Sequence, residues 1–312
     1  MAKILITESI HPSGPELLKK AGHQVVMVEG RDYGQVKKEI ADADAVIVRI
    51  MELPRPLLET AEKLKIVSKH GVGIDNIDLE YCREAGIAVT VTPNANSLSV
   101  AEHAFALMMA LAKNVIPVSN AYRENGFSAK NHKEGVEISE KTLGLIGLGC
   151  IGSRFADMAV GGFHMKVLAY DPYIAEEPDG VIMVRDLEEL LKKADFVSLH
   201  CALVPETRHM INAERLAQMK PSAFLINCAR GALVDEAALV EVLQKEKLAG
   251  AGLDVTDPEP EPADSLLFRM PNVIVTPHYA PSTIEAAARV SQMAAENIRQ
   301  FLSGMDPEGR KI

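Results

Sequence analysis

Three side chains that could form an acid–base site follow three apolar runs of the sequence. Arg230 comes after the run 223–227, His278 comes after the run 273–276, and Glu259 lies in the loop behind a third run. An arginine binds anionic oxygens, and a histidine exchanges a proton close to neutral pH. Taken singly, the arginine would be solvated, the glutamate exposed and the histidine packed. Because ligands bind beyond the carboxyl ends of parallel strands, the shared placement of the three predicts a catalytic site.

A glycine-rich segment upstream adds a second chemical function. Gly147, Gly149 and Gly152 have G-x-G-x-x-G spacing between a strand-like run and a run with helical apolar spacing. The first glycine makes a tight turn, the second lets the backbone approach a pyrophosphate, and the third lets the helix pack on the strand. Asp171 ends the next apolar run, about twenty residues on, where a carboxylate can accept both ribose hydroxyls. The segment predicts a dinucleotide site that favours NAD, because Asp171 would repel a 2′-phosphate.

Short apolar runs alternate with helical or turn-like segments along the whole chain, which is typical of parallel α/β sheets. The first group covers residues 4–6, 25–28, 45–48, 64–67 and 88–91. A second group begins at Thr142, with runs near Leu143, Val167, Phe196, Phe224, 252–255 and Ile274. We therefore expect an α/β protein of two doubly wound parallel-sheet domains with a cleft between them. A Rossmann NAD-binding domain would cover 97–282, and a discontinuous flavodoxin-like substrate domain would cover 1–96 plus 283–312.

Two patterns of the type Ser-x-x-Glu predict where long helices begin. Ser99 and Glu102 open a helix that runs to about Lys113 and is apolar nearly all round. Such a helix must be buried on most sides, between the domains or against a second subunit, so a homodimer is our hypothesis. Ser282 and Glu285 open the last helix, which we expect to cross back to the first domain.

The composition argues against several classes of protein. The chain has 312 residues, of which 47% are hydrophobic, and its formal charge of −10 disfavours a nucleic-acid partner. The sequence opens without a signal-peptide pattern, and its most apolar stretch, 104–112, is too short to cross a bilayer. We expect a soluble cytoplasmic protein without a membrane partner. The four cysteines have no zinc-ligand spacing, so buried free thiols and no structural metal are expected.

More specific motifs run through the whole chain. They are KHGVGIDNID at 69–78, PNANS at 93–97, the glycine loop, PETRHMIN at 205–212, NCARG at 227–231, LDV at 253–255 and TPH at 276–278. With these motifs the chain resembles the D-2-hydroxyacid dehydrogenase family, and within it the phosphoglycerate dehydrogenase branch. Pro281 departs from the family pattern, which has a small residue at this position, and a proline there removes a backbone donor beside the nicotinamide. The sequence ends without the regulatory C-terminal module of many such enzymes, so we expect a short form without serine feedback of that type.

The resemblance implies a role for each of the three side chains. Arg230 would hold the substrate carboxylate and polarise the keto oxygen, because its planar fork fits such oxygens. His278 would be the general acid in reduction and the base in oxidation. Glu259 would orient the imidazole and favour its protonated form. NAD would carry the hydride.

The resemblance also implies ligand contacts at individual positions. The residues that it places at the cofactor are Gly147, Gly149, Cys150, Ile151, Gly152, Asp171, Cys201, Thr207, Cys228, Ala229 and Asp254. The residues that it places at the substrate are Arg49, Lys69, Val72 and Gly73 of the first domain, with Arg230 and His278.

Several functions remain open at this point. The main one is NAD-dependent interconversion of a 2-keto acid and its (R)-2-hydroxy acid. The pair could be 3-phosphohydroxypyruvate and 3-phosphoglycerate, which needs extra cations such as Arg49 and Lys69, or the substrate could be hydroxypyruvate or glyoxylate. A non-catalytic NAD-sensing protein is the alternative from another class, and the presence of Arg230, Glu259 and His278 together disfavours it. A formate dehydrogenase would pair the histidine with glutamine, and Glu259 argues against that.

Overall fold

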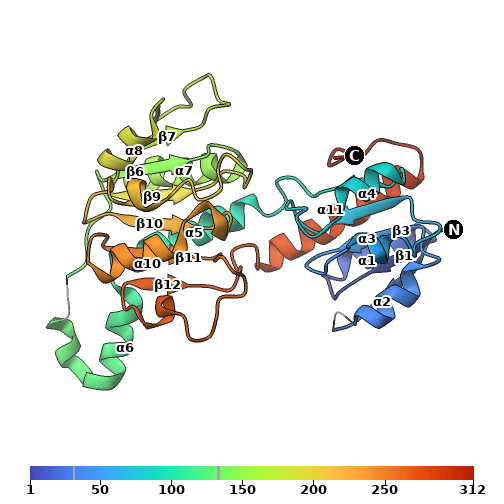
Figure 1. Ribbon diagram of the computed structural model, residues 1–312, viewed down its shortest axis with the longest axis horizontal. Coiled ribbons are helices and arrows are strands. Elements are labelled where there is room, and N and C mark those ends of the chain that lie inside the picture. Colours follow the sequence, from blue (N-terminus) through green and yellow to red (C-terminus); the bar gives the residue numbers. More distant parts are fainter. Residues whose placement is uncertain (31, 132–133) are drawn as a thin grey trace. The chain divides into compact units, whose positions relative to one another are not determined.

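The computed structural model describes residues 1–30, 32–131 and 134–312. The chain forms two compact units, which we call unit 1 (residues 1–96 and 282–312) and unit 2 (residues 97–281). Each unit is built on one parallel sheet with helices against it (Figure 1). The predicted α/β class with two doubly wound parallel sheets is confirmed.

Unit 1 has five strands in the order β2-β1-β3-β4-β5, the flavodoxin-like order. The strands are β1 Lys3–Ile6, β2 Gln24–Met27, β3 Ala45–Val48, β4 Ile66–Lys69 and β5 Ala88–Thr90. Its helices are α1 Ser13–Lys20, α2 Tyr33–Ile40, α3 Arg55–Leu58, α4 Leu79–Glu84 and α11 Ile284–Leu302. The central strand β3 reads AVIV and is buried throughout, as a parallel strand covered on both faces must be.

Helix α11 completes unit 1 from the far end of the sequence. Ser68 of β4 donates its hydroxyl to the carbonyl of Ala294 at 2.9 Å. A Cβ on Gly14 of α1 would lie 2.4 Å from the carbonyl oxygen of Ser291, so only glycine permits this close approach of α1 and α11. The residues after 281 therefore belong with the first sheet.

Unit 2 has seven strands in the order β12-β11-β10-β9-β6-β7-β8. They are β6 Thr142–Ile146, β7 Lys166–Tyr170, β8 Val181–Met183, β9 Phe196–Leu199, β10 Phe224–Asn227, β11 Gly250–Leu253 and β12 Val273–Val275. Its α-helices are α5 Ser97–Ala112, α6 Val115–Asn125, α7 Cys150–Phe163, α8 Leu187–Lys193, α9 Ala213–Leu216 and α10 Glu236–Gln244. The short helical turns are η1 Gly126–Asn131, η2 Gly231–Leu233 and η3 Leu266–Arg269.

The strand order of unit 2 is the Rossmann order with one strand added at the β12 edge. The chain order reverses at β6, which lies between β7 and β9. In an open α/β sheet the crevice outside the carboxyl ends of the strands at this reversal is where a nucleotide binds. The loop after β6 therefore has the position that a dinucleotide requires.

Helices α5 and α6 differ sharply in burial. Helix α5 packs on the unit 2 sheet, where a Cβ on Gly252 of β11 would lie 3.1 Å from Leu107 Cβ. Helix α6, drawn in green below the sheet in Figure 1, has no buried residue among those described. No single described helix is long and apolar enough to cross a membrane, although the bent pair 97–112 and 115–131 passes that test of length and composition together.

Both predicted helix starts are corrected by the structure. Helix α5 begins at Ser97, and Ser99 is buried inside it. The chain turns at Asn94, whose φ of 62° is left-handed, and the helix begins soon after that turn. Helix α11 is capped by Thr283, whose hydroxyl accepts a backbone hydrogen bond at 3.1 Å, and not by Ser282. The cap of α11 is therefore the threonine next to the predicted serine, and both residue types can accept such a bond.

Candidate active site

The glycine loop between β6 and α7 is shaped by backbone contacts. Gly147 has φ of +92°, and a Cβ there would lie 2.7 Å from the backbone nitrogen of Cys201. A Cβ on Gly152 would lie 2.3 Å from the carbonyl oxygen of Gly147. Apart from Gly149 itself and its two chain neighbours, no described heavy atom lies within 4 Å of a Cβ on Gly149, so this position borders open space. The turn, the opening and the close helix–strand approach are the three features that a pyrophosphate-binding loop needs.

Asp171, directly after β7, lies beside this loop. One carboxylate oxygen accepts a hydrogen bond from the backbone N–H of Leu148 at 2.9 Å, and the other accepts from that of Tyr173 at 2.9 Å. Each oxygen keeps a further lone pair for a hydroxyl donor. The acid is thus fixed at the strand end where a ribose would lie.

Glu259 and His278 meet after β11 and β12. Glu259 Oε1 lies 2.7 Å from His278 Nδ1, and both side chains are partly exposed. With Nδ1–H donating to the carboxylate, Nε2 is the ring nitrogen that can exchange a proton with a ligand. The predicted pair is therefore assembled within unit 2.

The turn that carries His278 is held by Asp254, the residue directly after β11. The backbone N–H of His278 donates to the carbonyl of Asp254 at 2.7 Å. The Asp254 carboxylate accepts from the N–H groups of Tyr279 at 2.7 Å and Ala280 at 2.8 Å. His278 has φ of 52°, an uncommon conformation for a residue with a side chain, and these bonds keep it there.

The charge of Asp254 is stabilised inside the protein. Burial on its own raises the pKa of this carboxyl, but hydrogen bonds from His103, Thr276 and two backbone amides outweigh burial and lower the pKa below its ordinary value. Thr276 donates its hydroxyl to Asp254 at 2.6 Å, and His103 Nε2 lies 3.0 Å from the Thr276 hydroxyl oxygen. Asp254 thus remains a carboxylate that orients the histidine turn, and its contact with a cofactor stays a prediction.

Arg230 follows β10 on a loop fixed by a buried amide. Asn227 donates to the carbonyl of Arg230 at 2.8 Å and accepts from the backbone N–H of Ala229 at 3.0 Å. The Arg230 guanidinium donates to the carbonyl of Ala229 at 2.7 Å and is partly exposed. A planar fork with donors on several edges can hold one carbonyl and still bind a carboxylate.

Two of the predicted cofactor positions of unit 2, Cys201 and Cys228, are cysteines in the loops after β9 and β10. Burial raises the pKa of Cys201 to about 11 and raises that of Cys228 further, so both stay neutral thiols. Cys150 is exposed, which corrects the expectation of burial, because it begins α7 beside the open space at Gly149. Ile151 is half-buried, packing against the unit 2 core. Within the described ranges, no group of three or more His, Cys, Asp or Glu side chains could hold a metal ion.

Thr207 shapes the loop after β9. Its hydroxyl donates to the carbonyl of Ala202 at 2.7 Å and accepts from the N–H of Val204 at 2.9 Å. The structure therefore uses this side chain to close a turn, and its contact with the cofactor stays a prediction.

The substrate candidates of unit 1 lie at the end of β4, where Lys69 is the last residue, and in the loops after β3 and β4. Lys69 is buried, and its ammonium donates at 2.5 Å to the carbonyl of Arg49 and at 2.5 Å to Asn76 Oδ1. Arg49 itself is exposed, as is Val72, while Gly73 is half-buried. Glu8, which the sequence did not single out, is buried and accepts the backbone N–H of Arg49 at 2.8 Å. Lys69 is thus mainly engaged with the protein, whereas Arg49 is directed to solvent.

Three supporting residues were absent from the predicted site. Asn227 and Thr276 lie inside the NCARG and TPH motifs, so the motifs themselves were the signal. Glu8 has no such signal, because its role depends on a pairing with the end of β3 across 41 residues.

Comparison with known proteins gives one consistent family. Residues 105–280 match the family described as D-isomer specific 2-hydroxyacid dehydrogenase, NAD binding domain. The chain is 43% identical to D-3-phosphoglycerate dehydrogenase of Methanocaldococcus jannaschii, in an alignment of 97% of this chain and 58% of that protein. It is 37% identical to glyoxylate reductase of Pyrococcus furiosus, over 98% of this chain and 94% of that one. A solved structure of a Thermus thermophilus protein has a TM-score of 0.93 at 36% identity, over 99% and 100% of the two chains.

The chain spans a little over half the length of the phosphoglycerate dehydrogenase that it matches, and nearly the full length of the glyoxylate reductase. The family match extends from α5 to the turn after β12, so it includes the glycine loop, Asp171 and the Glu259–His278 pair. The resemblance indicated by the motifs is confirmed. The chain belongs to the D-isomer specific 2-hydroxyacid dehydrogenase family.

Proposed function

We propose that this protein is a dehydrogenase that reduces a 2-keto acid to an (R)-2-hydroxy acid with NADH and catalyses the reverse reaction with NAD. The observation that carries the proposal is the 2.7 Å contact between Glu259 and His278 at the strand ends of the nucleotide-binding unit. A histidine supported by a carboxylate is an acid–base group, and NAD binding alone would not require it.

The glycine loop fits the cofactor. The left-handed turn at Gly147 and the space beside Gly149 suit a pyrophosphate, and Asp171 suits the ribose hydroxyls. When bound, the nicotinamide supplies or accepts the hydride. We propose unit 2 as the NAD-binding unit and unit 1 as the unit that adds substrate contacts.

The side chains of unit 2 perform the remaining chemistry. Arg230 binds the substrate carboxylate and polarises the keto oxygen through its planar donors. His278 donates its Nε2 proton to that oxygen during reduction and removes the hydroxyl proton during oxidation. Glu259 retains the Nδ1 proton of His278 and stabilises the imidazolium, so the ring keeps one orientation.

The test is loss of NADH absorbance with a panel of 2-keto acids: 3-phosphohydroxypyruvate, hydroxypyruvate, glyoxylate and pyruvate. We expect turnover with at least one acid and a loss of about a hundredfold or more in kcat for His278→Ala. NADH affinity, followed by cofactor fluorescence, should be preserved in that variant. NADH binding without turnover on any acid would refute the enzyme proposal and favour the NAD-sensing alternative.

The activities of the relatives and the exposure of Arg49 together suggest which acid is the substrate. The phosphoglycerate dehydrogenase relative favours 3-phosphoglycerate, and the glyoxylate reductase relative favours a short, uncharged tail. The exposed Arg49 is the better candidate for a phosphate contact, because Lys69 already donates to Arg49 and Asn76. Arg49→Ala should raise KM for 3-phosphohydroxypyruvate about tenfold or more and leave KM for glyoxylate nearly unchanged. Equal effects on both acids would refute a phosphate contact.

A second copy of the chain is the proposed protein partner. The apolar residues of α6 and the turn after it are largely exposed, with Val115 at 52%, Tyr122 at 59% and Phe127 at 73%. Such a surface is usually covered, and a symmetric dimer can pair it with itself. Sedimentation should give a dimer for the wild type and a monomer for the double variant Tyr122→Ser/Phe127→Ser. A monomeric wild type would refute the dimer proposal. Cytoplasmic location and the absence of nucleic-acid and membrane partners stay predictions.

A further inference from the structure

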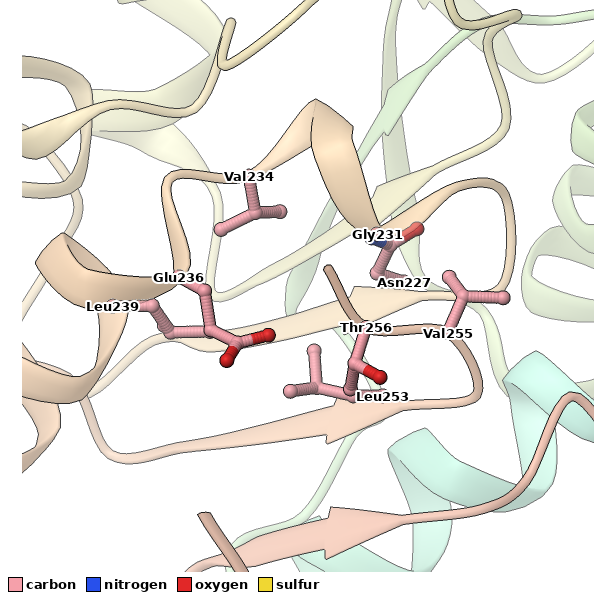
Figure 2. A pocket seen from close by; sticks show the side chains of 8 residues that line it. All are labelled: Asn227, Gly231, Val234, Glu236, Leu239, Leu253, Val255 and Thr256. Atoms are coloured by element: carbon pink, nitrogen blue, oxygen red, sulfur yellow. The ribbon is translucent and has the colours of Figure 1, made fainter. Parts of the chain in front are cut away.

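The loop of residues 254–262, here called the Glu259 loop, is anchored by Glu236 at the start of α10. Glu236 Oε2 accepts a hydrogen bond from the backbone N–H of Asp257 at 3.2 Å. Figure 2 shows the Glu236 carboxylate projecting toward Thr256. Thr256 in turn donates its hydroxyl to the carbonyl of Pro258 at 3.0 Å. Two hydrogen bonds, one from Asp257 to α10 and one within residues 256–258, therefore hold the stretch that precedes Glu259.

The loop that carries Arg230 packs against the same segment. A Cβ on Gly231 would lie 2.0 Å from the carbonyl oxygen of Thr256 and 2.7 Å from the nitrogen of Asp257. These are backbone atoms, so the two loops touch without room for a side chain. Fixing residues 256–258 thus fixes Glu259 with respect to Arg230 and His278 together.

A small, mostly apolar pocket is formed by residues of the two loops and their neighbours. It is lined by Asn227, Gly231, Val234, Glu236, Leu239, Leu253, Val255 and Thr256 (Figure 2). Glu236 extends from α10, whose first turn is capped by Asp235 through a 3.1 Å bond to the N–H of Ala238. The anchor is therefore on a helix of the Rossmann body, which is more rigid than a loop.

The groups around Glu236 favour its role as a hydrogen-bond acceptor over a role in an ion pair. Burial raises the pKa of its carboxyl above the ordinary value, since the lowering by the hydrogen bond from the Asp257 N–H is outweighed by burial together with the nearby acids Glu261 and Asp257. The carboxylate of Asp257 faces Arg208 at 3.5 Å and His209 at 3.9 Å, so these two side chains are directed to Asp257. A carboxyl oxygen accepts a backbone N–H whether or not the group is ionised, and an amide oxygen does the same.

We propose that Glu236 is a positioning residue for the reaction: by holding the N–H of Asp257 it keeps the Glu259 carboxylate against His278. The inference rests on the proposed dehydrogenase function. Glu236 acts only through Glu259, and its acceptor oxygen, not its charge, is what counts.

The test compares two replacements of similar size. Glu236→Gln retains an acceptor oxygen, whereas Glu236→Met does not. Glu236→Met should lower kcat about tenfold to a hundredfold, since a displaced catalytic group costs that much, while NADH affinity is preserved. Glu236→Gln should remain within about threefold of wild type, because the hydrogen bond to Asp257 is kept. Equal losses for Gln and Met would overturn the proposal.

A double-mutant cycle shows through which residue Glu236 acts. In a Glu259→Gln background, Glu236→Met should lower kcat by less than about twofold, because the carboxylate that it positions is already gone. The same loss in both backgrounds would overturn the proposal. Should Glu236→Met fail to fold, Thr256→Val breaks the second hydrogen bond of residues 256–258 with little change in volume and should give the same pattern.

A spectroscopic readout separates this inference from the function on which it rests. The Nδ1 proton of His278, identified in the NMR spectrum by its loss in His278→Ala, reports the bond to Glu259 without turnover. It should remain downfield in wild type and Glu236→Gln and be lost in Glu236→Met. A wild type without turnover but with this pattern refutes the enzyme proposal and supports the positioning role. An unchanged signal in Glu236→Met overturns that role even in an active enzyme.

Discussion

The glycine loop permits a sharp prediction, because Gly147 and Gly149 are two residues apart and their surroundings are opposite. Alanine at position 147 would have φ of +92° and a Cβ 2.7 Å from backbone atoms of residues 200 and 201, which cannot move aside. The backbone strain costs about 1–2 kcal/mol and the overlap about 1–3 kcal/mol, so Gly147→Ala should destabilise unit 2 by about 2–5 kcal/mol. Alanine at position 149 meets no described atom within 4 Å, so Gly149→Ala should change stability by less than about 1 kcal/mol.

Thermal unfolding and NADH titration test this pair. At about 2–4 °C per kcal/mol for a domain of this size, Gly147→Ala should melt about 5–20 °C below wild type. Gly149→Ala should melt with wild type but bind NADH about tenfold more weakly, because its methyl group occupies the space for the pyrophosphate. Equal melting of both variants, or unchanged NADH affinity in Gly149→Ala, would refute this assignment of the two glycines.

Three further predictions address charge. Arg230→Lys should lower kcat/KM about a hundredfold or more while the fold is preserved, since an ammonium cannot replace the bidentate fork; steady-state kinetics and circular dichroism would check this. Burial lowers the pKa of His200 to about 3, so as pH falls below about 6.5 the unfolded chain binds a proton that the folded one refuses, and stability should fall. His200→Gln should flatten that decline in urea unfolding, and an unchanged slope would contradict it. The pKa of Asp254 is lowered in the fold, so its stabilisation is present above its unfolded pKa and lost as pH falls through the folded value. Asp254→Asn should cost about 1–3 kcal/mol at neutral pH, and a neutral effect would remove the role assigned to its bonds.

Local chemistry explains why the nucleotide site could be predicted from sequence. The turn at Gly147, the approach at Gly152 and the acid at Asp171 all follow from one β-α-β unit, so their spacing in the sequence is also their arrangement in space. Glu259 and His278 are 19 residues apart, and their pairing followed from the rule that parallel strands end at one edge.

The failures of prediction have physical causes of their own. The exposure of Cys150 depends on open space beside Gly149, which residue type does not reveal. Strand β8 was missed although residues 181–184 read VIMV; it is a short edge strand in which Val181 is buried and Ile182 is exposed. Helix α6 buries none of its residues within the described chain, so the periodicity that marks a packed helix is absent from its sequence.

Two glycines from different motifs, Gly147 of the glycine loop and Gly231 of NCARG, solve the same problem at different strands. Gly147 lets the loop after β6 touch the backbone after β9, and Gly231 lets the loop after β10 touch the backbone after β11. A parallel sheet brings strand ends to one edge but leaves the loops beyond them separate. Removing the side chain where two loops cross allows backbone to lie on backbone, so that each loop fixes its neighbour. The cofactor loop and the Arg230 and Glu259 loops are therefore positioned by contacts that a single methyl group would abolish.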